Sequence, residues 1–183
     1  MSLAMRTLWF AWFFVVVASL VVVGQGQPET SFVLKMKYMK VDLPTSDAST
    51  CLAVFPDGRF RMEQISEWPA AYPRIFEDSL PDEGFKSLST ILDAKDLKEL
   101  KTVAPSSGVI SQGEMVQVII SRAEATQALF AIALEGSGKQ VFRPLPEPLR
   151  PLVEWLQATT KSVNKRKLKP LKNAKPVNCW MGR

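Results

Sequence analysis

The stretch CLAVFPDGRFRME, residues 51–63, carries the clearest local structural signal in the chain. Two segments of strand-forming residues flank Pro56-Asp57-Gly58, and an Asp-Gly pair accepts the positive φ angles that a tight hairpin turn requires. In the second segment Phe60 and Met62 alternate with charged residues, which is typical of a half-buried strand. The sequence therefore predicts an antiparallel hairpin here.

Other segments show strand-like alternation or a high content of β-branched residues. The strands expected from this pattern are Phe32–Val41, Met115–Ser121, Ala128–Leu134 and a short Gln140–Arg143. Leu43–Thr50 is expected to be turn-rich, and Glu67–Ser79 is expected to be irregular because it contains prolines. Trp68, Tyr72 and Phe76 in the latter are spaced four apart, which suggests a binding face or a loop that closes over the core.

Two helices are expected from amphipathic spacing. The first opens at Pro81-Asp82-Glu83, where acidic residues suit the helix dipole, and a short helical turn follows within Asp93–Lys101. The second begins near Leu149 and requires Pro151 to lie in its first turn. Its apolar residues recur at helical intervals, at Leu149, Leu152, Val153 and Leu156.

The order of strands, helix, strands and helix, without alternating strand–helix–strand units, favours an α+β fold. We expect one antiparallel sheet built from hairpins, with two main helices on one face, preceded by an N-terminal export helix. A single α+β domain is predicted over residues 32–163.

The N-terminal segment indicates export. Arg6 precedes the apolar run Leu8–Val23, and small residues follow at Gly24 and Gly26. We predict a signal peptide over residues 1–24, a linker over 25–31, and a periplasmic or secreted location. The alternative is an uncleaved single-pass anchor with the domain outside, in which case the chain contacts a membrane only through residues 8–23.

The charge is unevenly distributed. The net charge is +5, yet residues 1–160 hold 15 basic and 18 acidic residues, and no acidic residue follows Glu154. The predicted extended tail, residues 164–183, is therefore strongly basic, and its prolines and lysines build no core, which favours a solvated tail. The alternative is a tail that contacts an anionic surface polymer or another envelope protein. An exported location argues against nucleic acid. The candidate polyanion contacts are Lys165, Arg166, Lys167, Lys169, Lys172 and Lys175.

The chain has two cysteines, Cys51 and Cys179. In an oxidising compartment an even number of cysteines favours pairing, so we predict a disulfide that ties the tail to the body of the domain.

No sequence motif indicates catalysis. The chain has no histidine, which removes the commonest general base and most zinc sites, and we name no catalytic, cofactor-binding or metal-binding residue. Glu77, Asp78, Asp82 and Glu83 cluster before the first helix and fit helix capping and surface charge. The sequence thus favours a non-enzymatic binding or structural protein of the envelope or secreted space. The alternatives are a hydrolase of envelope carbohydrate that uses these carboxylates, and a membrane-tethered structural protein.

Overall fold

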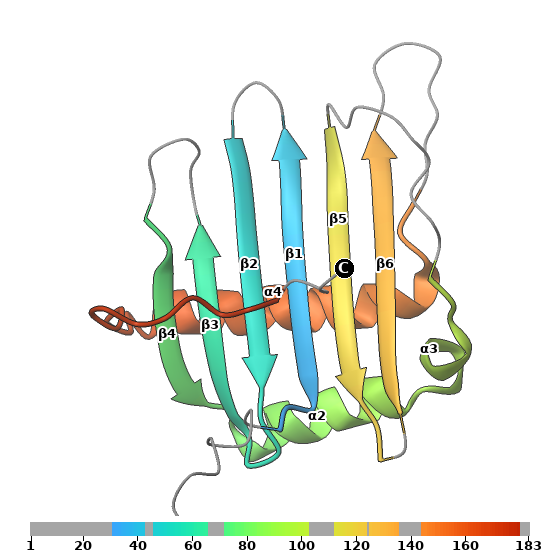
Figure 1. The fold of residues 1–183 in the computed structure, drawn as a ribbon, viewed down its shortest axis with the longest axis horizontal. Coiled ribbons are helices and arrows are strands. Elements are labelled where there is room, and N and C mark those ends of the chain that lie inside the picture. The colour runs from blue at the N-terminus through green and yellow to red at the C-terminus, as the bar shows by residue number, and fades with distance from the viewer. Residues whose placement is uncertain are drawn as a thin grey trace, which may run out of the picture. The chain divides into compact units, whose positions relative to one another are not determined.

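The computed structural model describes residues 31–42, 46–65, 72–102, 112–123, 125–135 and 144–179. These residues form one six-stranded antiparallel sheet and a few helices, which confirms the α+β class (Figure 1). The strand order is β4-β3-β2-β1-β5-β6. The strands are β1 (Leu34–Asp42), β2 (Ser46–Val54), β3 (Arg59–Ile65), β4 (Arg74–Ser79), β5 (Gln112–Ser121) and β6 (Thr126–Glu135).

The predicted hairpin joins β2 to β3. Gly58 has a φ angle of 79°, which glycine adopts without steric cost, and its amide donates to the Phe55 carbonyl at 3.0 Å. The Asp57 carboxylate accepts hydrogen bonds from the backbone amide and from Nε of Arg59, at 3.1 and 2.6 Å. The Arg59 side chain, followed by the backbone hydrogen bond, lowers the pKa of Asp57 below its ordinary value. The Asp-Gly pair thus fixes the turn.

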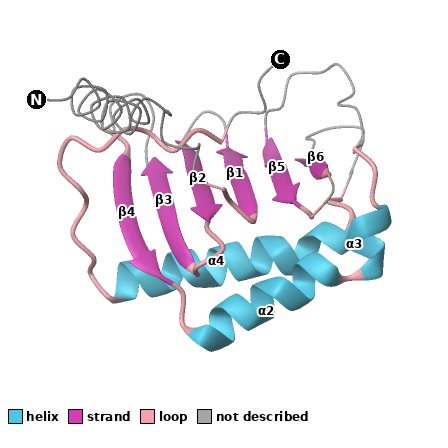
Figure 2. Ribbon diagram, turned by 60° about the horizontal axis from the view of Figure 1, so that its bottom comes forward, coloured by secondary structure: helices cyan, strands magenta, loops and turns pink. Residues whose placement is uncertain are grey.

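The helices lie together on one face of the sheet (Figure 2). They are α2 (Asp82–Asp93), the short α3 (Lys95–Glu99), a 3-10 turn η2 (Glu147–Leu149) and α4 (Arg150–Lys165). Pro81 occupies the N-cap of α2, and Pro151 lies in the first turn of α4, where its missing amide hydrogen costs no helical hydrogen bond.

The core lies between this helical layer and the sheet. Alternate strand residues point toward the helices, and the fully buried ones include Leu34, Met36, Leu52, Val54, Met62, Val116 and Val118. The helices contribute buried leucines at positions 88, 97, 149, 152 and 156. The amphipathic spacing of α2 and α4 is thus explained by burial of one helix face against the sheet.

Two predictions about the strands were wrong. Ser46–Thr50 continues β2 instead of forming a turn, because these residues pair in register with β1, for example Ser49 with Met39. Arg74–Ser79 forms β4 instead of an irregular segment. The proline before it, Pro73, is compatible with β4 because it precedes the strand, and β4 lies at the edge of the sheet.

The expected aromatic stripe does not form one surface in the described part of the chain. Tyr72 is 91% exposed, whereas Phe76 is 4% exposed and belongs to the core. Trp68, the strand predicted at 140–143 and the export segment at 1–24 lie outside the described residues. None of the helices within the described ranges is long and apolar enough to span a membrane.

Candidate functional site

The predicted basic tail crosses the sheet. After α4 ends at Lys165, residues 166–179, which we call the strap, pass around the outer edge of β4 and return over the face opposite the helices (Figure 1). At the edge, the Leu171 amide donates to the Ile75 carbonyl at 2.8 Å. This bond uses a carbonyl that an edge strand otherwise leaves open, so the strap also protects part of the β4 edge.

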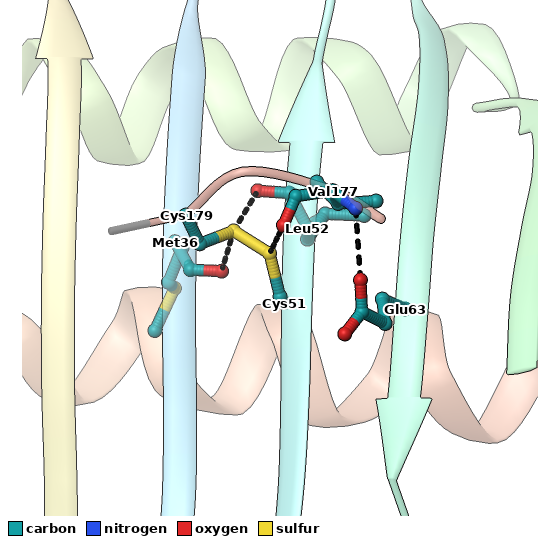
Figure 3. Close-up of a disulfide and its surroundings, with 6 residues drawn as sticks. All are labelled: Met36, Cys51, Leu52, Glu63, Val177 and Cys179. Carbon is teal, nitrogen blue, oxygen red and sulfur yellow. Dashed lines mark hydrogen bonds between the residues drawn. A yellow bond between two sulfur atoms is a disulfide. The ribbon is translucent and has the colours of Figure 1, made fainter. Parts of the chain in front are cut away.

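The strap is fixed at several points across the neighbouring strands. Nη2 of Arg61 on β3 donates to the Lys175 carbonyl at 2.6 Å, and the Val177 amide donates to Oε2 of Glu63 at 2.8 Å. The disulfide between Cys51 and Cys179 follows, with 6.0 Å between the Cα atoms (Figure 3). The predicted pairing is therefore present in the structure.

The disulfide is enclosed by backbone. Sγ of Cys179 lies 3.4 Å from the Met36 carbonyl oxygen, and Sγ of Cys51 lies 3.3 Å from that of Val177. A disulfide sulfur carries no hydrogen, so these are packing contacts and not hydrogen bonds. Cys51 is 7% exposed and Cys179 is 3% exposed, which shields the bond from thiols in solution.

All six predicted polyanion contacts are exposed. Lys165 ends α4 and the other five lie in the strap, so they share one edge of the domain and part of its open sheet face. Arg166 forms an ion pair with Asp78; the five lysines have no ion pair among the residues that the structure describes. These cations therefore lie on a segment that is bonded to the folded domain. The sequence predicted the disulfide that ties down this segment, but not the path that the segment takes.

The four acidic residues that cluster in the sequence before the first helix lie in two elements, β4 and α2. Glu77 and Asp78 are consecutive residues of β4 and point to opposite faces. Glu77 lies 3.3 Å from Nε of Arg61, and Asp78 pairs with Arg166. Asp82 and Glu83 are exposed in the first turn of α2. Glu77 and Asp78 therefore do not form the facing pair of carboxyl groups that glycoside hydrolysis requires.

A polar cluster that sequence reasoning missed lies between the sheet and α4. The Tyr38 hydroxyl donates to Oε1 of Glu114 at 2.8 Å and also interacts with Gln157 of α4. Its members come from β1, β5 and α4, which are far apart in the sequence, so no local motif predicts the cluster. Burial, followed by the hydrogen bond to Glu114, raises the pKa of Tyr38 well above its ordinary value.

Comparison with known proteins adds no family. No family model matches the chain, and no curated protein matches its sequence. Within the described ranges, no group of three or more cysteine, aspartate and glutamate residues is arranged to hold a metal ion.

Proposed function

We propose that this chain is an exported, non-enzymatic domain that binds an anionic polymer of the cell envelope or the extracellular space through the cations of the strap. One observation carries the proposal: six cations between residues 165 and 175 are exposed on a segment anchored by the Cys51–Cys179 disulfide. No acidic residue follows Glu154 in the sequence, and among the described residues only Arg166 of these six cations has an ion pair, with Asp78.

Anchoring favours binding. A free basic arm loses conformational freedom when it binds, whereas the strap is already ordered by its bonds to β2, β3 and β4. Because its phosphate or carboxylate partners carry condensed counterions, the affinity should fall steeply with salt.

The test uses two matched triple variants. Lys169→Gln/Lys172→Gln/Lys175→Gln removes strap cations, and Lys86→Gln/Lys101→Gln/Arg150→Gln removes the same charge from exposed positions outside the strap that, like the strap lysines, have no ion pair among the described residues. Binding to polyphosphate and to polygalacturonate is measured by titration at several salt concentrations. We expect the strap variant to lose at least about tenfold in affinity, with a shallower salt dependence, and the control to change less than about twofold. An equal loss in both variants would reject a specific surface.

Export is tested separately. The disulfide is consistent with an oxidising compartment. We expect the intact mass from the exported fraction of producing cells to begin near Gln25 or Gln27, with both cysteines blocked until reduction. A full-length mass confined to the membrane fraction would instead support the tethered alternative.

A further inference from the structure

A surface pocket with a volume of about 340 Å³ lies where the end of α4 meets β4. Its floor is apolar, and its rim is formed by the exposed polar side chains of Arg74, Asn164 and Lys167. The apolar lining residues are Phe76, Val163, Leu168 and Pro170. An apolar floor with a few polar groups at its rim, in a volume of about 300–1,000 Å³, is typical of small-ligand sites.

The rim of this pocket is positively charged. Neither Arg74 nor Lys167 has an ion pair among the described residues, and no carboxylate lines the pocket. Asp78, two residues beyond Phe76 on β4, is already paired with Arg166. A ligand anion would therefore meet two uncompensated cations and the amide of Asn164.

The second described pocket has a different character. It has a volume of about 310 Å³ and lies against the opposite part of α4, where Glu114, Arg150 and Glu154 supply charges of both signs. Of these two pockets in the described part of the chain, the one beside β4 alone combines an apolar floor with cations that lack carboxylate partners. An anion with an attached apolar group would match both the cations and the apolar floor of the pocket beside β4.

We infer that the α4–β4 pocket binds an amphipathic anion, with the apolar group on Phe76 and Leu168 and a phosphate or carboxylate between Arg74 and Lys167. Burial of the apolar group favours binding, and charge-assisted hydrogen bonds orient the anion. Binding of such a ligand is a separate activity from polymer binding by the strap. Exposed lysines can attract a polymer by charge alone, whereas this ligand also uses the apolar floor of the pocket. The same chemistry is offered by an anionic lipid and by a soluble organic acid.

The experiment measures binding to the disulfide-bonded protein by two-dimensional NMR titration. The probes are dihexanoyl phosphatidylglycerol below its micelle concentration, hexanoate, inorganic phosphate and, as the charge control, dihexanoyl phosphatidylcholine. The variants are Arg74→Gln and Lys167→Gln, with Lys172→Gln as a strap cation outside the pocket. Amide shifts at Asn164 and Leu168 report occupancy.

We expect the phosphatidylglycerol or hexanoate to bind at least about tenfold more tightly than phosphate and phosphatidylcholine, and each pocket variant to lose about tenfold while Lys172→Gln does not. Preference for phosphatidylglycerol identifies a lipid source, and preference for hexanoate a soluble acid. The inference fails if phosphate binds as tightly as the amphiphiles, or if Lys172→Gln weakens binding as much as Arg74→Gln. Polymer binding by Arg74→Gln is measured in parallel, so that failure of the pocket and failure of the strap surface are distinguished.

Discussion

Cys51 in β2 is bonded to Cys179 in the strap, although 128 residues separate them in the sequence. The bond closes a loop that contains the end of β2, the whole of β3, β4, β5 and β6, and all of the described helices. It also holds the end of the strap over the open face of the sheet. One covalent link thus serves both the stability of the domain and the position of the proposed binding surface.

The first prediction concerns stability. Replacing both cysteines, Cys51→Ala/Cys179→Ala, should lower the free energy of unfolding by about 2–5 kcal/mol, because the loop-entropy model gives about 5 kcal/mol as an upper figure for a loop of this length. Urea unfolding followed by circular dichroism measures the change. Wild-type protein that has been reduced in urea and refolded with reductant present should match the variant, and an unchanged midpoint in both would contradict the prediction.

The second prediction concerns access to the disulfide. Because Cys51 and Cys179 are almost fully buried, reduction should require the strap to open first. We expect a thiol reductant to act at least about 100-fold more slowly on the native protein than on the protein in urea. Quenched samples analysed by intact mass give both rates, and similar rates would show that the bond is accessible in the folded state.

The elements that local patterns specify were predicted well. The Asp57-Gly58 turn identifies the hairpin through its backbone requirement, and the leucine spacing identifies α2 and α4 through their buried faces. β4 was missed because Pro69 and Pro73 argue against a regular element over Glu67–Ser79. In addition, its two buried residues, Ile75 and Phe76, are adjacent and show no strand-like alternation. Its pairing with β3 overrides that local pattern, which no single segment reveals.

The path of the strap had no sequence signal beyond the cysteine count. Its course depends on the carbonyl of Ile75 and on the side chains of Arg61 and Glu63, which are more than ninety residues away from it. The α4–β4 pocket could not be predicted from the sequence for the same reason. Arg74 and Lys167 come to line one pocket only when α4 packs against the sheet. Such sites depend on tertiary structure and leave no local motif.

The third prediction concerns the two glycines whose surroundings differ most. In β5, a Cβ atom added to Gly113 would lie 2.2 Å from the Ala133 carbonyl oxygen of β6, and the φ angle is +157°. Gly113→Ala should therefore destabilise the domain by at least about 2 kcal/mol, since backbone must move. Gly84→Ala in α2 is the matched control, because its Cβ atom meets only Pro81 Cδ at 3.5 Å. The control should stabilise the domain by about 0.5–1 kcal/mol. Equal effects in chemical denaturation would refute the steric argument.

The fourth prediction concerns alkaline pH. Burial and the hydrogen bond to Glu114 favour the neutral form of Tyr38, so its pKa is raised above the ordinary value of 10.0. The resulting stabilisation is fully present below pH 10 and decreases above it, because the unfolded chain releases this proton first. Absorbance at about 295 nm, wild type minus Tyr38→Phe, isolates the titration of this residue from that of Tyr72. The midpoint should lie higher in the folded protein than in urea, and the stability advantage of wild type over Tyr38→Phe should shrink as the pH rises above 10. Coincident midpoints in the folded and unfolded protein would mean that the contact between Tyr38 and Glu114 does not favour the protonated hydroxyl.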